Sequence, residues 1–349
     1  MLLKKLQELT GDEILARDIT TWDYKIILPA GAVIRREYIE KLKDLEIQEV
    51  YIREEEQNHE IVILKAEIEE SVKSTVKEIL ERHTYRNNKE LMELSTAADN
   101  IISTILEEEQ VIERVYDIKE RNADIYEHSI SICSLSILTA LKLGVEISKI
   151  HDIGVGCLLH DIGLRYMTID YNNKDVDTMS RQELIEYKKH PVYGYSSLKN
   201  EKWISDMSKN IILYHHERLD GSGFPLRIKE IPFECRIVNV CDAFDEMICG
   251  IACRRVKVYE AVEYLKSFKD IKFDSDIVDA FLGFTAVYPA GTRVMTNQGE
   301  LAEVVSQNKD FQDRPVIRII KDKDGNDVKG EVIKNLVKVH NIFIEKAID

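Results

Sequence analysis

Histidine and aspartate residues gather in one stretch of the sequence at spacings that could build a metal site. His215 and His216 are adjacent, and a turn-forming run with two glycines and a closing Pro225 follows them. Imidazole residues are ordinary helix formers at best, while Gly and Pro end helices, so a purely structural helix rarely has this composition. His160-Asp161 lies upstream. Imidazoles and carboxylates at such intervals can converge on metal ions, and we predict that they do so here.

The same stretch contributes an ordered series of potential ligands. In chain order its members are His128, His160, Asp161, His190, His215, His216 and Asp242. Neighbouring helix residues point about 100° apart, so two adjacent histidines cannot both face one apolar stripe. A cleft that both residues border accommodates them better. We expect ordinary capping, core or surface roles for the remaining histidines, which are His59, His83, His151 and His340.

The length and net charge of the chain limit the kinds of ligand that it could bind and the cellular location that we expect. The chain has 349 residues, enough for two or three domains, and a formal net charge of −15. This acidic balance argues against a nucleic acid polymer, which clustered Lys and Arg would bind, and leaves a small anionic ligand open. No apolar run reaches the roughly 18 residues that span a bilayer. We therefore expect a cytoplasmic protein without membrane insertion, whose six cysteines are reduced and mostly buried.

Hydrophobic periodicity predicts a mainly α fold with a small module at each end. The predicted parts are a small α/β module over 1–57, a helical linker over 58–119, a helical bundle over 120–284 and a small β-barrel or sandwich-like module over 285–349. In the bundle we expect helices at 125–143, 148–160, 182–190, 205–216, 235–249, 258–268 and 274–281. A bundle with inward-facing polar side chains can hold a metal site in its core.

An apolar stripe at helical spacing runs through residues 61–118, with dense Glu, Lys and Arg elsewhere. Two interpretations remain open. The stripe could cover the core of its own chain, or the helices could form a homodimer or transmit a signal.

The ordered motifs resemble the HD-GYP family within the HD phosphohydrolase superfamily. The resemblance covers roughly residues 120 to 284 and rests on the order of five sequence motifs. These are Tyr126-Glu127-His128-Ser129, Leu158-Leu159-His160-Asp161-Ile162-Gly163, His190-Pro191-Val192-Tyr193-Gly194, the run from His215 to Pro225, and Arg236 to Asp245. A lone His-Asp pair would be weak evidence, whereas the ordered series is specific.

The resemblance implies a binuclear centre of iron or manganese. His128, His160, Asp161 and Asp242 would hold one metal. His190, His215 and His216 would hold the second, with Asp161 as the bridging and catalytic residue. Some family members hold a third metal through a carboxylate four residues before the first histidine, where this chain has Asp124. Carboxylates can bridge two cations, and neutral imidazoles complete the coordination of such ions.

The implied reaction is hydrolysis of cyclic di-GMP to linear pGpG, and in some members to GMP, by a metal-bridging hydroxide. The substrate-binding residues implied here are Arg218, Gly221, Gly223, Phe224 and Arg254. The two glycines would let the backbone turn tightly beside the metals.

Three positions depart from the family pattern and leave alternatives open. Leu164 stands where the family usually has Lys, Phe224 replaces the signature Tyr, and Ile251 replaces an Arg. Electrostatic stabilisers of phosphoryl transfer are each worth a few kcal/mol. The pattern therefore fits a slow phosphodiesterase, a phosphohydrolase for another phosphoester, or a cyclic-dinucleotide or metal sensor that does not turn over.

Overall fold

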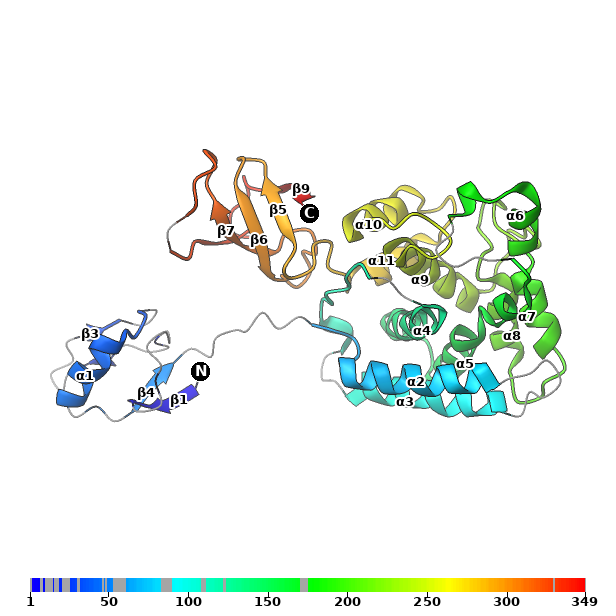
Figure 1. Ribbon diagram of the computed structural model, residues 1–349, viewed down its shortest axis with the longest axis horizontal. Helices are drawn as coiled ribbons and strands as arrows, with labels where there is room; N and C mark the ends of the chain where they lie inside the picture. Colours follow the sequence, from blue (N-terminus) through cyan, green and yellow to red (C-terminus); the bar gives the residue numbers. More distant parts are fainter. Residues whose placement is uncertain are drawn as a thin grey trace. The chain divides into compact units, whose positions relative to one another are not determined.

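The computed structural model describes most of residues 61–349 and part of the first 60 residues. It leaves out 83–89, 108–110, 122–123, 170–174, 329 and 349, and among the first 60 residues it describes 2–6, 9, 15, 19–20, 26–29, 32–45, 47 and 49–52. The chain divides into two compact units, Met1–His59 and Glu60–Asp349. Figure 1 shows the elements of each unit.

The first unit is a small α/β module, as its sequence predicts. Strand β1 (Leu2–Lys5) pairs antiparallel with β4 (Glu49–Ile52), and β2 (Ile19–Thr20) pairs with β3 (Ile26–Leu28). Helix α1 (Arg36–Asp44) completes it. Leu15, Ile34 and Leu42 are buried in its own core.

The second unit consists mainly of helices. They are α2 (Ala66–Arg82), α3 (Glu93–Glu107), α4 (Ile125–Lys142), α5 (Ile147–Leu159), α6 (Arg181–Tyr187), α7 (His190–Leu198), α8 (Asp206–Tyr214), α9 (Phe233–Cys249), α10 (Val258–Ser267) and α11 (Ser275–Leu282). Single 3-10 turns lie at Glu90–Met92, Val111–Glu113, Ile162–Tyr166 and Val176–Thr178. The predicted mainly α fold is thus confirmed. None of the helices among the described residues has both the length and the apolar character needed to cross a membrane.

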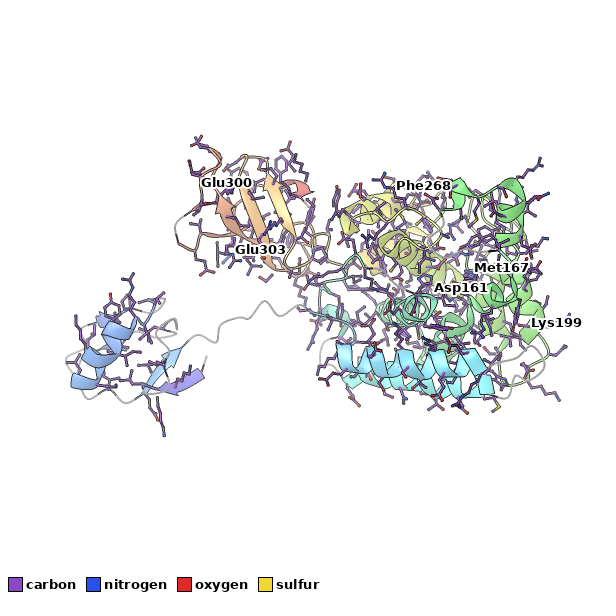
Figure 2. The ribbon with its side chains drawn as sticks, viewed as in Figure 1. Asp161, Met167, Lys199, Phe268, Glu300 and Glu303 are labelled. Carbon is purple, nitrogen blue, oxygen red and sulfur yellow. The ribbon has the colours of Figure 1, made fainter. Side chains whose placement is uncertain are left out.

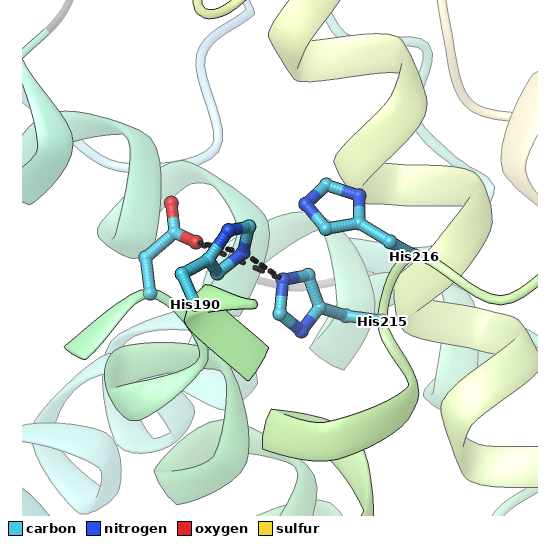
Figure 3. A group of neighbouring side chains, drawn as sticks. His190, His215 and His216 are labelled. Atoms are coloured by element: carbon cyan, nitrogen blue, oxygen red, sulfur yellow. Dashed lines mark hydrogen bonds and ion pairs between the residues drawn. The ribbon is translucent and has the colours of Figure 1, made fainter. Parts of the chain in front are cut away.

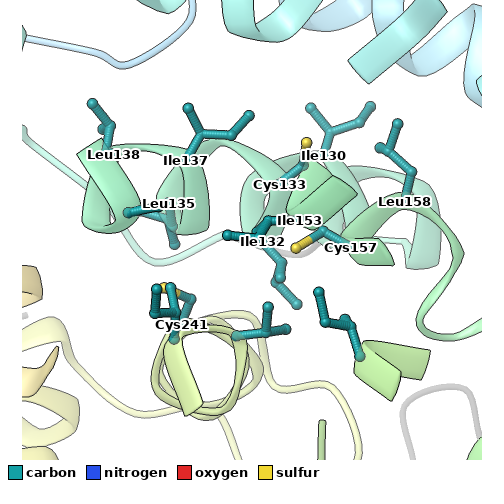
Figure 4. Packing of buried hydrophobic residues seen from close by; sticks show 14 of the residues in the cluster. Ile130, Ile132, Cys133, Leu135, Ile137, Leu138, Ile153, Cys157, Leu158 and Cys241 are labelled. Carbon is teal, nitrogen blue, oxygen red and sulfur yellow. The ribbon is translucent and has the colours of Figure 1, made fainter. Parts of the chain in front are cut away.

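Helix α4 lies at the centre of this unit and is buried on nearly all sides. It contacts α2, α3, α5, α9 and α11, and Figure 1 shows α2 and α3 on one side of it with α9 on the other. A helix that is apolar around its circumference is expected in such a position. Figure 4 shows Ile132 and Leu135 of α4 among the packed side chains, together with Cys157 and Cys241. Both thiols are free and buried, as expected.

The apolar stripe of α2 and α3 packs into this same core. Val76, Leu94, Ile101 and Ile105 are fully buried within the cluster that also contains α4 and α5. Both helices contact α4, and α3 also contacts α5. The stripe therefore covers the core of its own chain, and a homodimer through these helices stays a prediction.

The helix predicted over 182–190 ends earlier than expected, and a further helix that was not predicted follows it. Helix α6 ends at Tyr187 and α7 begins at His190, with Pro191 in its first turn. Proline lacks a backbone N–H and is tolerated only in the first turn of a helix, so the chain restarts there. The break places His190 at a helix N-terminus.

The C-terminal module is one antiparallel sheet. Its strands are β5 (Arg293–Thr296), β6 (Leu301–Ser306), β7 (Val316–Lys321), β8 (Ile333–Asn335) and β9 (Ile344–Ile348), in the order β8-β7-β6-β5-β9. Gly299 and Gly325 have positive φ in the turns that the sequence predicts. Strand β9, at the edge, has no turn signal before it and was not predicted. The buried carboxylate of Asp117 joins this module to the helices, because its Oδ1 accepts from the N–H of Ala290 and from Gln307 Nε2.

Gly163 lies where the turn after α5 meets the start of α7. A Cβ at this position would lie 1.9 Å from the carbonyl oxygen of His190. We predict that Gly163→Ala lowers the free energy of unfolding by about 1–3 kcal/mol or more, because a backbone atom must move. Thermal unfolding measures this. The control is Gly283→Ala, whose Cβ mainly meets the flexible end of Lys142 at 3.0 Å; equal destabilisation of both variants would contradict the prediction.

Candidate metal centre

Five elements of the second unit deliver the predicted ligands to one place in the core. His128 lies one turn into α4, and His160 caps the C-terminus of α5 with Asp161 directly after it. His190 opens α7, His215 caps the C-terminus of α8 with His216 next, and Asp242 lies in the middle of α9. Helix ends and the turns beside them allow adjacent residues such as His215 and His216 to point inward together. All seven side chains are buried, and Figure 2 labels Asp161 among the helices of the unit.

One group of potential ligands consists of Asp161, His190, His215 and His216. Asp161 Oδ1 lies 3.2 Å from His190 Nε2 and 3.7 Å from His215 Nε2. The Nε2 atoms of His190 and His215 are 3.1 Å apart. Figure 3 shows His190 and His215 turned toward each other with His216 beside them.

A second group consists of His128, His160 and Asp242. Asp242 Oδ1 lies 3.4 Å from His128 Nε2 and 3.8 Å from His160 Nε2. The two groups meet at Asp161, because its Oδ2 lies 3.3 Å from His160 Nε2 while its Oδ1 faces the first group. One carboxylate therefore faces both groups, as the resemblance implies for a bridging ligand.

The second nitrogen of four imidazoles is held by a hydrogen bond away from the cluster. His160 Nδ1 donates to the carbonyl of Cys157 at 2.7 Å, His190 Nδ1 to that of Tyr187 at 2.8 Å, and His215 Nδ1 to that of Ile212 at 3.0 Å. His128 Nδ1 lies 2.8 Å from Asp245 Oδ2. Such outer partners fix the tautomer, so the Nε2 atoms turn to the centre as ligands.

Burial and mutual repulsion keep two of the imidazoles neutral. Burial, followed by the charges of His160 and His190, lowers the pKa of His215 to about 3. Burial and the neighbouring His215 hold the pKa of His216 well below its usual range. Burial by itself would raise the pKa of Asp161, but His160 and His190 hold that pKa well below its usual value. Neutral imidazoles and an ionised carboxylate are the forms that bind metals.

Three buried atoms at the centre have no hydrogen-bond partner among the residues that the structure describes. They are His160 Nε2 and both carboxylate oxygens of Asp242. Buried polar groups are almost always satisfied, and a buried charge is costly unless it is paired or coordinates a metal. These donors, together with the mixed imidazole and carboxylate set, fit divalent cations such as iron or manganese.

Two acidic residues near the centre were missed from sequence. Glu246, four residues after Asp242 on α9, forms a third potential group with His216 and Asp242. The i,i+4 spacing was the available signal. Asp245 is fully buried and supports His128, and it also accepts from Ser131 Oγ at 2.7 Å and Arg121 Nη2 at 2.9 Å. Its partners come from distant parts of the chain, so no sequence spacing could identify this role.

Asp124 lies apart from these groups of potential ligands. Its side chain caps α4 by accepting from the N–H groups of Tyr126 and Glu127, and it pairs with Lys73 at 3.2 Å. This carboxylate is therefore already occupied, and the geometry gives no support to a third metal held through it.

The predicted substrate-binding residues divide between the centre and other places. Phe224 stacks on His216 with ring centroids 4.4 Å apart, because the turn folds back and the Phe224 N–H donates to the His216 carbonyl. Gly223 allows this turn, since a Cβ there would lie 2.5 Å from the His216 carbonyl oxygen, and Gly221 has a φ of +79°. Arg218 donates instead to the carbonyls of His215 and Glu217.

Arg254 lies in a cavity of about 560 Å³ lined also by Glu120, Tyr259 and Ala347 of β9. None of the potential metal ligands lines this cavity. The structure therefore does not bring Arg254 into the groups around Asp161.

Comparisons with known proteins agree with the geometry. Residues 110–277 match the HD domain family, and residues 293–349 match the KOW domain associated with the HD domain. A cyclic di-GMP phosphodiesterase of Pseudomonas aeruginosa is 27% identical over 218 residues, 61% of this chain and 52% of that protein. The cyclic di-GMP phosphodiesterase response regulator RpfG of Xanthomonas campestris is 32% identical over 149 residues, 42% of this chain and 39% of that protein.

A solved structure from Bdellovibrio bacteriovorus, described as an HDG"Y"P protein, has the same fold with a TM-score of 0.53. It is 23% identical, and the match covers 80% of this chain and 97% of that one. These matches confirm the resemblance drawn from the motifs. The chain spans about half the length or less of the two curated relatives described.

Asp245 offers a test of the outer support of the centre. We predict that Asp245→Asn weakens metal binding by about 10- to 100-fold, because His128 loses the carboxylate that orients it. Chelator competition measures the affinity. Asp99→Asn is the matched control, since the exposed Asp99 pairs with the partly buried His151 at 2.7 Å outside the site. Ser131→Ala removes one hydrogen bond from Asp245 without unpairing Arg121 and serves if the first variant fails to fold. Unchanged affinity in both Asp245→Asn and Ser131→Ala would contradict the prediction.

Proposed function

Because residues 110–277 are an HD domain of the kind found in named cyclic di-GMP phosphodiesterases, we propose that this protein is a metal-dependent phosphodiesterase. Its proposed substrate is cyclic di-GMP, which it opens to linear pGpG; the same chemistry applied to pGpG would yield GMP. The observation that carries the proposal is the position of Asp161 between two groups of buried imidazoles.

The proposed centre holds two divalent cations, one in each group that Asp161 faces. When bound, such a pair activates a bridging water near neutral pH and stabilises the charge that develops on a phosphoryl centre. Asp161 and Asp242 supply the anionic oxygens, and the imidazoles supply neutral nitrogens that leave net positive charge for the phosphate. Iron or manganese suits this donor set.

Burial of the ligands contributes to the proposed reaction. The side chains of His160, His190, His215 and Asp242 have no exposed surface, so their interactions are weakly screened by water. Electrostatic interactions in such a site are stronger than in solvent, and they need no reorganisation during the reaction. The Phe224 ring, stacked on His216, provides an aromatic surface at which a guanine base of the substrate could pack.

A second candidate function is a sensor that binds a metal and a cyclic dinucleotide without turnover. The observation that favours it is that Leu164 and Ile251 replace two cations of the family pattern. Leu164 is 2% exposed and packs with Tyr187, Ala252, Phe224 and Ile251 in an apolar cluster. Leu164 and Ile251, which stand where the family has cations, therefore belong to this apolar cluster, which we call the apolar wall. A phosphohydrolase for another phosphoester would fit the same observation.

One preparation can separate these functions. The protein is purified anaerobically, iron and manganese are measured by elemental analysis, and cyclic di-GMP is followed by chromatography with and without added Mn²⁺ or Fe²⁺. We expect about two metals per chain and linear product. Two metals with intact substrate would favour the sensor or another substrate, and absence of metal under every loading would overturn the proposal.

Asp161→Asn tests the role of the bridging carboxylate. We expect turnover to fall on the order of 10²–10³-fold or more while the variant still unfolds cooperatively, since the amide is isosteric but neutral. Asp99→Asn again serves as the matched control. A variant that keeps full turnover would show that Asp161 is not needed at the reacting phosphate.

A further inference from the structure

The apolar cluster around Leu164, Tyr187 and Ile251 offers no cation to a bound substrate. A cyclic dinucleotide carries two phosphates, and two metals can neutralise only the one that reacts. Arg218, which we predicted to bind substrate, already has other partners. Its guanidinium donates to two carbonyls and lies 5.1 Å from the ring centroid of Phe273. Arg165, the neighbour of Leu164, lies with its Nη1 3.4 Å from the hydroxyl of Tyr126.

Lys188 occupies a position beside the wall that sequence reasoning did not consider. Its Nζ lies 5.5 Å from the ring centroid of Phe224, and that same ring stacks on His216 with centroids 4.4 Å apart. One aromatic ring therefore connects the ammonium group to a potential metal ligand. Tyr187, which precedes Lys188, also packs near Phe224, with centroids 6.4 Å apart.

The backbone around Lys188 is held on both sides. Lys188 caps the C-terminus of α6, and its N–H donates to the carbonyl of Leu184 at 3.1 Å. Tyr187 is buried and accepts from His190 Nδ1 at 2.8 Å, so the residues flanking the break between α6 and α7 are tied to the centre. The half-buried Lys188 side chain thus extends from a fixed point, which reduces the entropy lost when it binds a ligand.

The adjacent Lys189 is arranged differently. It is exposed, and its Nζ pairs with Glu186 at 3.1 Å. Two neighbouring residues of the same type therefore differ in their surroundings, one facing the aromatic wall and one paired on the surface.

We propose that Lys188 is a substrate-binding residue that contacts the non-reacting phosphate of a cyclic dinucleotide. This inference rests on the proposed function and adds to it the cation that the apolar residues at 164 and 251 do not supply. A lysine ammonium is a compact point charge with three donors, which suits a phosphate whose orientation is set elsewhere. The contact is made in the ground state and the transition state alike, so it acts on KM more than on kcat.

The test compares Lys188→Ala, Lys188→Arg and Lys189→Ala in the metal-loaded full chain with cyclic di-GMP. We expect Lys188→Ala to raise KM about 10- to 100-fold with kcat changed little, because one charge-assisted hydrogen bond is lost. Lys188→Arg should restore most of the affinity, and Lys189→Ala should behave as wild type. Added salt should raise the KM of the wild type more than that of Lys188→Ala.

Metal content separates this role from a structural one. Lys188→Ala should retain the metals of the wild type, as elemental analysis will show, so a loss of metal would indicate damage to His190 and would overturn the inference. Equal KM values in the Lys188→Ala and Lys189→Ala variants would overturn it as well, with the proposed function intact. If the wild type binds cyclic di-GMP without turnover, the same variants are compared by calorimetric titration. A wild type that neither binds nor cleaves cyclic di-GMP would overturn the proposed function first, and this inference with it.

Discussion

The burial of two carboxylates among five imidazoles is the constraint on which the rest of this structure depends. Asp161 and Asp242 lie in the core with His128, His160, His190, His215 and His216. Ionised groups in such surroundings are costly unless they are paired or coordinate a cation. Three of the imidazoles donate from Nδ1 to backbone carbonyls, which keeps their rings turned into the buried cluster. The acceptors are the carbonyls of Cys157, Tyr187 and Ile212. A divalent cation in each group would offset the desolvation that the fold imposes.

The apolar helices make this cluster possible by holding five separate elements to fixed positions. Helix α4 is enclosed by α2, α3, α5, α9 and α11, and interiors packed at this density allow little movement of the side chains they carry. The helices α2 and α3, which lie before the matched HD region, belong to this frame through Val76, Leu94 and Ile101. The metal centre is thus supported by more of the chain than the motifs themselves cover.

The sequence allowed accurate prediction where a local signal existed. Helix α4 could be placed from its apolar run and Gly144. The seven potential ligands were proposed from their types and order, and the fold brings them into two neighbouring groups, while their role as ligands stays a prediction. The helix predicted over 182–190 was placed to end three residues late, and α7 was not predicted, although Pro191 is typical of the first turn of a helix. Asp245 was missed for a different reason, since its partners Arg121 and Ser131 come from other segments and only the folded chain brings them together. Asp124 had the right spacing for a ligand, but capping α4 and pairing with Lys73 occupies its side chain.

The changes at 164 and 251 are best understood together with the rest of their surroundings. Leu164 and Ile251 pack with Tyr187 and Phe224, so replacing either of them alone by a cation would place an unpaired charge in an apolar cluster. Under the proposed function, a cation for the second phosphate would lie at the edge of this cluster, where a long side chain can keep its charged end in water. Lys188 is placed at such an edge, over the Phe224 ring. Under the proposed function, this apolar cluster and the Lys188 ammonium would act together: the metals would neutralise the reacting phosphate, and the lysine would contact the other.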